Sequence, residues 1–319
     1  MDERFLENLR REPRPEFAAT LRDKLRSQES RSVAWRHGRT RALAFAAAAV
    51  IAVSLFALPS VRASATAMLD MFRVRKFAVV QFDESRLEKL RSLKDERAFL
   101  IFDRKEVHRE PGPARYMASL EAAEAEAGLK AARLTYIPTG LIPDSIYVEG
   151  AGEARFAVSE TKLREALDLL DLRDVSVPPG LEGQWVDVRK PPVVIQTFKS
   201  ARGNEVGLMQ AMSPEVALPP GLDLARLAEV GLRILGLDQG EARRIAQATD
   251  WRSTLLVPVP MNASTFRQVT IHGQPGLLVT MENGKRNGSV VLWTENDRVF
   301  ALRTTLGSTV AVQMAESVQ

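Results

Sequence analysis

The side chains best suited to chemistry are few in this chain. It contains three histidines, His37, His108 and His272, and no cysteine. Thiol nucleophiles, disulfides and cysteine-ligated metal sites are therefore excluded. The histidines lie far apart, and none belongs to the H-E-x-x-H spacing that places two imidazoles on one metal ion. We expect no metal ion and no other cofactor.

Two histidines have neighbours that suit acid–base chemistry, but each has a simpler structural interpretation. His108 lies in FDRKEVHREPG (102–112) beside Asp103 and Glu106, a pattern typical of a charged, solvated loop. His272 begins a tight turn, where an exposed structural residue is expected. The sequence has no G-x-S-x-G elbow and no P-loop. We expect no enzyme. The alternative is a hydrolase that brings a histidine to a distant serine or carboxylate.

The longest apolar run has the length of a membrane span. Residues 42–61 are 20 residues without a charge. As a helix they cover about 30 Å, the thickness of a bilayer's hydrocarbon core. Ser54 and Ser60 are their only polar side chains and form no stripe, which disfavours a buried amphipathic helix. A single transmembrane helix in the lipid bilayer is therefore expected over 42–61.

Cleavage of this run as an export signal is the alternative to an anchor. Ala63-Ser64-Ala65 has the A-x-A form of a cleavage site. However, 41 residues precede the run, and a secretory signal has a shorter basic region and a shorter apolar stretch. Three arginines lie within six residues before the run and one within six after it, which favours a cytoplasmic head and an extracytoplasmic C-terminal part.

The charge distribution separates the head from the rest of the chain. Residues 1–41 hold 11 basic and 7 acidic side chains, a net charge of +4, and the remaining 33 basic and 33 acidic side chains cancel. A nucleic-acid-binding domain needs a basic excess of its own. We therefore expect no direct binding of nucleic acid, and a basic head beside a membrane.

The head, 1–41, contains two short helical patterns separated by Pro13 and Pro15. Each has an apolar stripe that so short a segment cannot bury. Such a stripe suits a helix that docks in a groove of another protein; the alternative is that both segments lie on the membrane surface or stay partly disordered. The expected partner-binding residues are Phe5, Leu6, Leu9, Phe17, Leu21 and Leu25.

The sequence after the apolar run predicts a juxtamembrane strand and helical or loop segment over 62–118, followed by an α+β domain over 119–319. The first part includes a strand within 71–83, where β-branched and aromatic residues gather. The expected features of the second part are a helix that ends at Gly128, an extended segment to Ile137, a turn at Pro138 and Pro143, a helix over 159–172 capped by Ser159, a hairpin over 191–212 that turns near Gly203-Asn204, and helices over 222–236 and 239–248.

The chain ends in an antiparallel meander and a final short helix. Four strand patterns are separated by turn residues such as Gly273-Gln274-Pro275 and Asn296-Asp297. The expected strands are 267–272, 276–282, 289–294 and 298–305. Helices and hairpins come in blocks and not in βαβ alternation, which is typical of an α+β fold.

This order of segments resembles bacterial single-pass transmembrane anti-sigma factors of the non-zinc type. The resemblance rests on R-x-E-P-R-P-E-F-A-x-x-L-R-x-x-L (10–25), the span, SLEAAEAEAGLKAARLTYIPTGLIP (119–143) and the closing strands and helix (290–319). The last two are similar to an uncharacterised extracytoplasmic domain often found in such proteins. The H-x-x-x-C-x-x-C zinc site of the better-known branch is absent.

The resemblance implies that the head binds a sigma factor or another cytoplasmic regulator, while the outer domain senses or scaffolds. The expected function is therefore that of a membrane-anchored regulatory protein. The alternative is an anchored extracytoplasmic domain that binds lipid, lipoprotein or cell-wall material and whose head only targets the membrane. That alternative predicts an apolar groove over the meander.

Overall fold

The computed structural model describes residues 71–83, 85–86, 89, 102–217, 222–261, 264–281 and 287–319. The head with its six expected partner-binding residues, the apolar run 42–61 and Ala65 lie outside the described residues. Among the described residues, no helix has both the length and the apolar content needed to cross a bilayer.

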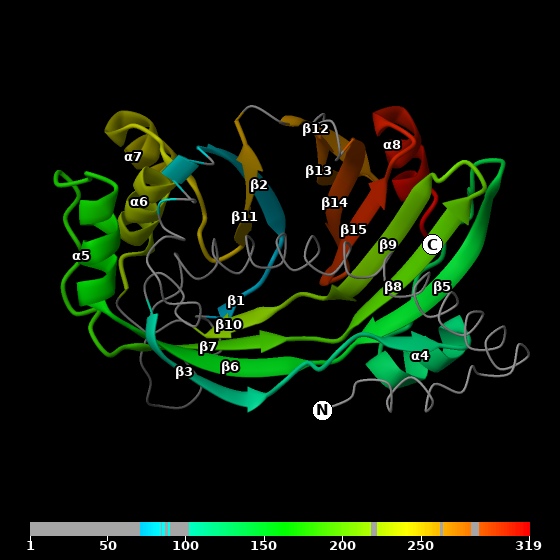
Figure 1. Ribbon diagram of the computed structural model, residues 1–319, viewed down its shortest axis with the longest axis horizontal. Helices are drawn as coiled ribbons and strands as arrows, with labels where there is room; N and C mark the ends of the chain where they lie inside the picture. Colours follow the sequence, from blue (N-terminus) through cyan, green and yellow to red (C-terminus); the bar gives the residue numbers. More distant parts are fainter. Residues whose placement is uncertain are drawn as a thin grey trace, which may run out of the picture. The chain divides into compact units, whose positions relative to one another are not determined.

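The largest sheet contains the predicted meander. Its eight antiparallel strands have the order β12-β13-β14-β15-β9-β8-β5-β4 (Figure 1). The strands are β4 (Arg115–Met117), β5 (Leu141–Glu149), β8 (Val193–Ser200), β9 (Glu205–Met212), β12 (Ser264–Ile271), β13 (Gln274–Met281), β14 (Gly288–Glu295) and β15 (Arg298–Thr304). The meander β12–β15 and the hairpin β8–β9 confirm the sequence prediction.

A second antiparallel sheet continues three strands of the first beyond a bend. Its order is β1-β10-β7-β6-β3, so β5, β8 and β9 lead into β6, β7 and β10 with the same neighbours (Figure 1). The strands are β1 (Met71–Phe72), β3 (Phe102–Arg109), β6 (Gly152–Val158), β7 (Trp185–Lys190) and β10 (Glu215–Ala217). The described residues are thus mostly β-structure.

The bend lies where the sequence interrupts the hydrogen-bond ladder. Pro191 and Pro192 separate β7 from β8, and Pro214 lies between β9 and β10. Proline has no N–H to donate, so a ladder stops there. On the third strand the bend is at Gly150, where a Cβ atom would lie 2.7 Å from the carbonyl oxygen of Pro111. The bend therefore requires glycine at this position.

Two further strands, β2 (Lys76–Phe82) and β11 (Thr254–Pro260), form a parallel pair. Their side chains Val79 and Val259 belong to an apolar cluster with Leu277 and Leu292 of the meander. The pair therefore covers one face of β13 and β14.

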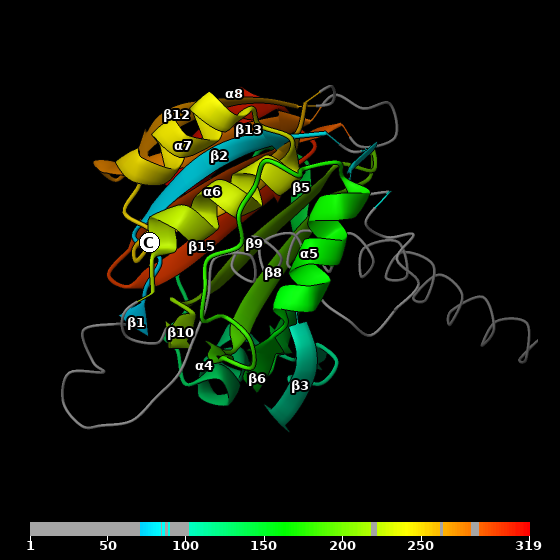
Figure 2. The ribbon, with the colours of Figure 1, turned by 90° about the vertical axis from the view of Figure 1, so that its left-hand side faces the viewer.

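The helices cover the two sheets on different faces. They are α4 (Leu120–Ala127), α5 (Glu160–Leu169), α6 (Leu224–Leu235), α7 (Gln239–Ala248) and α8 (Ser308–Glu316). Helices α5, α6 and α7 enclose the main core with the second sheet and β2. Figure 2 shows α6 against α7, with β2 alongside. Helix α8 covers the opposite face of the meander, over Trp293 and Phe300.

The helix boundaries follow local signals in the sequence. Ser159 caps α5 by accepting a hydrogen bond from the backbone N–H of Lys162, and Asp238 caps α7 by accepting one from Glu241. Helix α4 ends at Gly128, which has a left-handed φ of 61°. These predicted boundaries are confirmed.

Two expectations need correction. Pro143 lies within β5 and not in a turn, because β5 pairs with β8 around a register shift at that point. Residues 102–109 form strand β3 and not a loop, because they pair with β6. The expected extended segment from Leu129 to Ile137 lies outside the named strands, and Leu134 makes a single bridge to Val318. Strands β1 to β4 pair with strands beyond residue 119, so described residues of 62–118 and of 119–319 share sheets.

Candidate functional site

Strand alternation gives β8, β9 and β15 two apolar faces. Val194 and Phe198 of β8, Leu208 of β9 and Leu302 of β15 are buried, and Phe198, Leu208 and Leu302 form part of the core beneath α8. The residues between them point the other way. On that second face, Val193 and Ile195 of β8, Met209 and Ala211 of β9, and Val299 and Ala301 of β15 are all half-buried.

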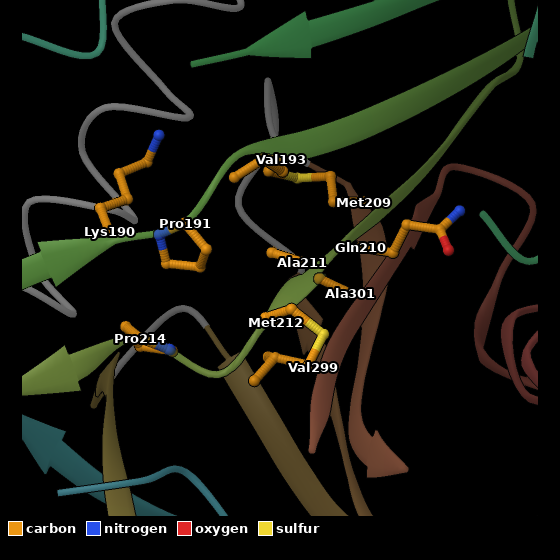
Figure 3. Close-up of a pocket in the computed structure, with 10 residues that line it drawn as sticks. All are labelled: Lys190, Pro191, Val193, Met209, Gln210, Ala211, Met212, Pro214, Val299 and Ala301. Carbon is orange, nitrogen blue, oxygen red and sulfur yellow. The ribbon is translucent and has the colours of Figure 1, made fainter. Parts of the chain in front are cut away.

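The second face contains a pocket of about 200 Å³ at the bend. Most of the side chains that line it are apolar and come from the three strands and the two proline breaks (Figure 3). They are Pro191, Val193, Met209, Ala211, Met212, Pro214, Val299 and Ala301, with Lys190 and Gln210. Protein pockets for drug-sized ligands measure about 300–1,000 Å³. This pocket suits part of a ligand, such as a segment of hydrocarbon chain.

The pocket lies between two covered parts of the same face. Val299 packs against the main core, and Ala301 is the cross-strand neighbour of Leu292, which lies beneath β2 and β11. Met212 is 41 % exposed. An apolar surface left open between two buried clusters is typical of a binding site.

The polar side chains at the pocket are engaged elsewhere. Lys190 Nζ lies 3.0 Å from Glu149 Oε1 and donates a hydrogen bond to the carbonyl of Gly150. The side chain of Gln210 points away from the other labelled residues (Figure 3). Its amide accepts from the N–H of Ala132 at 2.7 Å and donates to the carbonyl of Ala132 at 2.9 Å. The pocket therefore offers apolar contact and no reactive group.

Buried amides fix the strands behind the pocket. Gln196 Nε2 also donates to the carbonyl of Ala132, at 2.8 Å. Both glutamine side chains are less than a tenth exposed. Because these bonds are buried, they hold the segment after α4 firmly against β8 and β9.

A larger hollow of about 420 Å³ lies on the opposite face, beside α4. Its lining mixes apolar residues with Glu121, Arg133 and Asp144. Glu121 pairs with Arg133, and Asp144 pairs with Lys199. The pKa of Glu121 is lowered to about 2 by its own backbone N–H, by Arg133 and by Ser119. Since these charges already have partners, we take the bend pocket as the candidate site.

His272 is a structural residue in the turn between β12 and β13. Its Nδ1 lies 3.0 Å from Glu295 Oε2, and its Nε2 lies 2.9 Å from the carbonyl oxygen of Glu316 at the end of α8. Both neighbours are acceptors, so the imidazolium form is favoured. The hydrogen bond with Glu295 is the main cause of the raised pKa of His272. In the imidazolium form, neither ring nitrogen has a lone pair that could accept a proton from a serine hydroxyl.

The other candidates for chemistry are not gathered into a site. His108 is exposed on β3 and makes no hydrogen bond with another described residue. No group of three or more His, Asp or Glu side chains that could hold a metal ion occurs within the part of the chain that the structure describes.

Sequence reasoning predicted the pocket strands but not the pocket. The signal is in β8 and β9, where both alternating sets include apolar residues, as in VVI (193–195) and LM (208–209). A strand of a sheet with one solvated face alternates between apolar and polar residues. Apolar residues on both faces indicate that each face packs against another part of the protein or contacts a ligand.

Searches of family models, curated proteins and solved structures find no match to this chain.

Proposed function

We propose that this chain is a membrane-anchored regulatory protein whose outer domain senses an apolar ligand through the bend pocket. The apolar run 42–61 anchors it in the cell membrane with its N-terminus in the cytoplasm. The head, 1–41, binds a cytoplasmic partner, and the resemblance to anti-sigma factors favours a sigma factor.

The bend pocket is the observation that carries the sensing role. Its apolar residues come from three strands and two proline breaks, yet they leave a cavity open at the bend. Burial of hydrocarbon releases about 25 cal/mol per Å² of apolar surface removed from water. A hydrocarbon segment gains this contact without the loss of a buried hydrogen bond, because the polar groups beside the pocket already have partners.

A photo-crosslinking experiment tests the sensing role. The full-length chain in phosphatidylcholine nanodiscs is irradiated with a 16-carbon alcohol that carries a diazirine near the end of its chain, and labelled peptides are identified by mass spectrometry. We expect labelling between Met209 and Met212. Ala301→Trp fills the pocket and should remove this labelling, whereas Thr265→Trp on the exposed side of β12 should not. Equal labelling of the wild type and Ala301→Trp would overturn the proposal.

A separate experiment tests the partner of the head. The full-length chain is used to capture the purified sigma factors of the source organism. We expect one of them to bind the wild type and Arg22→Ser but not Leu21→Ser, which interrupts the apolar stripe. Failure of every sigma factor to bind the wild type would count against the regulatory role.

A second candidate is an anchored binding domain whose head is passive. The pocket favours it, because all of its lining residues lie between 190 and 301 and none belongs to the head. In that case, replacement of residues 1–41 by an unrelated basic segment leaves the cellular phenotype unchanged. Under the leading proposal the replacement abolishes regulation.

A further inference from the structure

Gly207 lies in the interior of β9, where glycine weakens a strand. Its pairing with β8 and β15 continues without a register shift, so it does not form a bulge. A Cβ atom at this position would meet nothing within 4 Å, so no neighbouring atom requires glycine. Glycine in such a position often marks a place where a ligand approaches the backbone.

The register places this open position beside the bend pocket. Gly207 pairs with Thr197 of β8 and Arg303 of β15, and the next row on the same face is Ile195, Met209 and Ala301. Rows two residues apart are about 7 Å from each other along a strand. The open position is therefore one row away from two residues that line the pocket.

Arg303 places a guanidinium at this end of the face. Its side chain is exposed, and it forms no ion pair or hydrogen bond with another described residue. The remaining charged residues nearby are Lys199, Asp144 and Glu205. Asp144 pairs with Lys199 and accepts a hydrogen bond from Thr197, the residue opposite Gly207, while Glu205 lies two residues before Gly207. Arg303 is thus the cation available beside the open position, within the part of the chain that the structure describes.

We propose that Arg303 and the open backbone at Gly207 form the head-group subsite for a single-chain amphiphile with an anionic head, whose tail occupies the bend pocket. This inference rests on the proposed sensing function and names its ligand class. The guanidinium pairs with a carboxylate or phosphate, because its planar N–H groups match both anions. The absence of a side chain at Gly207 lets the head approach the sheet, while the tail reaches Met209 and Ala301.

The test compares three probes with one 16-carbon chain and one diazirine position. The first is a fatty acid, the second is the alkyl phosphate and the third is the neutral alcohol. The full-length chain is irradiated in phosphatidylcholine nanodiscs below saturation, and labelling at Met209–Met212 is quantified. Each probe is compared between the wild type and a variant, so that differences in partition into the bilayer cancel.

We expect Arg303→Gln to lower labelling by the anionic probes about tenfold and to leave the alcohol unchanged, since a lost charge-assisted hydrogen bond has an effect of that order. Arg303→Lys should recover part of the loss because it keeps the charge. Gly207→Val fills the open space and should lower labelling by the anionic probes too. A loss confined to one anionic probe identifies the head as carboxylate or phosphate.

The proposal is overturned if Arg303→Gln changes labelling by all three probes equally or by none of them. If only the alcohol labels the wild-type pocket, the proposal that the ligand has an anionic head is overturned, while the proposed sensing function stands. If none of the probes labels the wild-type pocket, the proposed function itself fails. The two failures are therefore distinguishable.

Discussion

The pH dependence of stability around His272 provides a stringent test of the structure. The perturbation is His272→Asn. His272 has a positive φ of 49°, and asparagine tolerates this backbone region better than other non-glycine residues do. The substitution therefore removes the imidazole with little change to the turn.

The expected magnitude follows from the two contacts of the imidazolium. A hydrogen bond to a charged group contributes about 1.5–3 kcal/mol. The side chains of His272 and Glu295 are 23 % and 32 % exposed, so solvent weakens their interaction. The second contact places a cation at the C-terminus of α8, which is favourable by about 0.3–1 kcal/mol. Together we expect His272→Asn to lower the free energy of unfolding by about 1–2 kcal/mol at pH 6.

The sign of the pH dependence follows from the raised pKa of His272. In the unfolded chain its pKa is about 6.5. The stabilisation is therefore complete below that pH and is lost as the pH rises through the higher pKa of the folded state. The difference between wild type and His272→Asn should shrink between pH 6 and pH 9, by about 1.4 kcal/mol for each unit by which folding raises the pKa.

Urea unfolding of the full-length chain in detergent at pH 6 and pH 9 measures this difference. His108→Asn is the matched control, because His108 is exposed and makes no hydrogen bond with another described residue. NMR titration of the imidazoles gives the folded pKa directly, since the chain has three histidines. A difference that is equal at both pH values, or an imidazole of His272 that titrates below 6.5, would refute the reasoning.

Substitutions at four other positions test the fold. Gly150→Ala should lower stability by about 1–3 kcal/mol, because its Cβ would lie 2.7 Å from the backbone oxygen of Pro111. Gly207→Ala should raise stability by about 0.5–1 kcal/mol, because its Cβ would meet nothing within 4 Å. Thermal unfolding that finds Gly207→Ala less stable than Gly150→Ala would contradict the bend. Trp293→Ala should lower stability by about 3–5 kcal/mol, because the ring is fully buried beneath α8. Trp293→Phe should cost less, since the indole Nε1 has no hydrogen-bond partner among the described residues; chemical denaturation that finds equal losses would contradict this packing. Asp238→Ala should lower stability by about 1 kcal/mol, measured by the same unfolding experiments, and Asp238→Asn should be close to neutral, because asparagine also caps a helix.

Proline and glycine residues explain why the sheet bends beside the apolar face. Proline breaks in two strands and a glycine in a third all lie at one level across the sheet. Since each break removes ladder hydrogen bonds or a side chain, the bend exposes the second face of β8, β9 and β15 at that level. The position of the pocket is thus a consequence of where the breaks align.

Short-range features were predictable from the sequence because their causes lie within a few residues. Ser159 and Asp238 cap the helices that they precede, and the meander turns at residues with positive φ, such as Asn296 and Asp297. The strands β12 to β15 follow one another along the chain, so alternating residues and turns were enough to order them.

The pocket depended on the tertiary structure because its residues are distant in sequence. Lys190, Met212 and Ala301 meet only when β9 pairs with both β8 and β15, and the second pairing joins strands more than 80 residues apart. The same register places Arg303 opposite Gly207. By itself the sequence determined the helix ends, the meander and the division of charge between head and domain. Only the tertiary structure decided which apolar face stays open, because strand pairing between distant segments leaves no local signal in the chain.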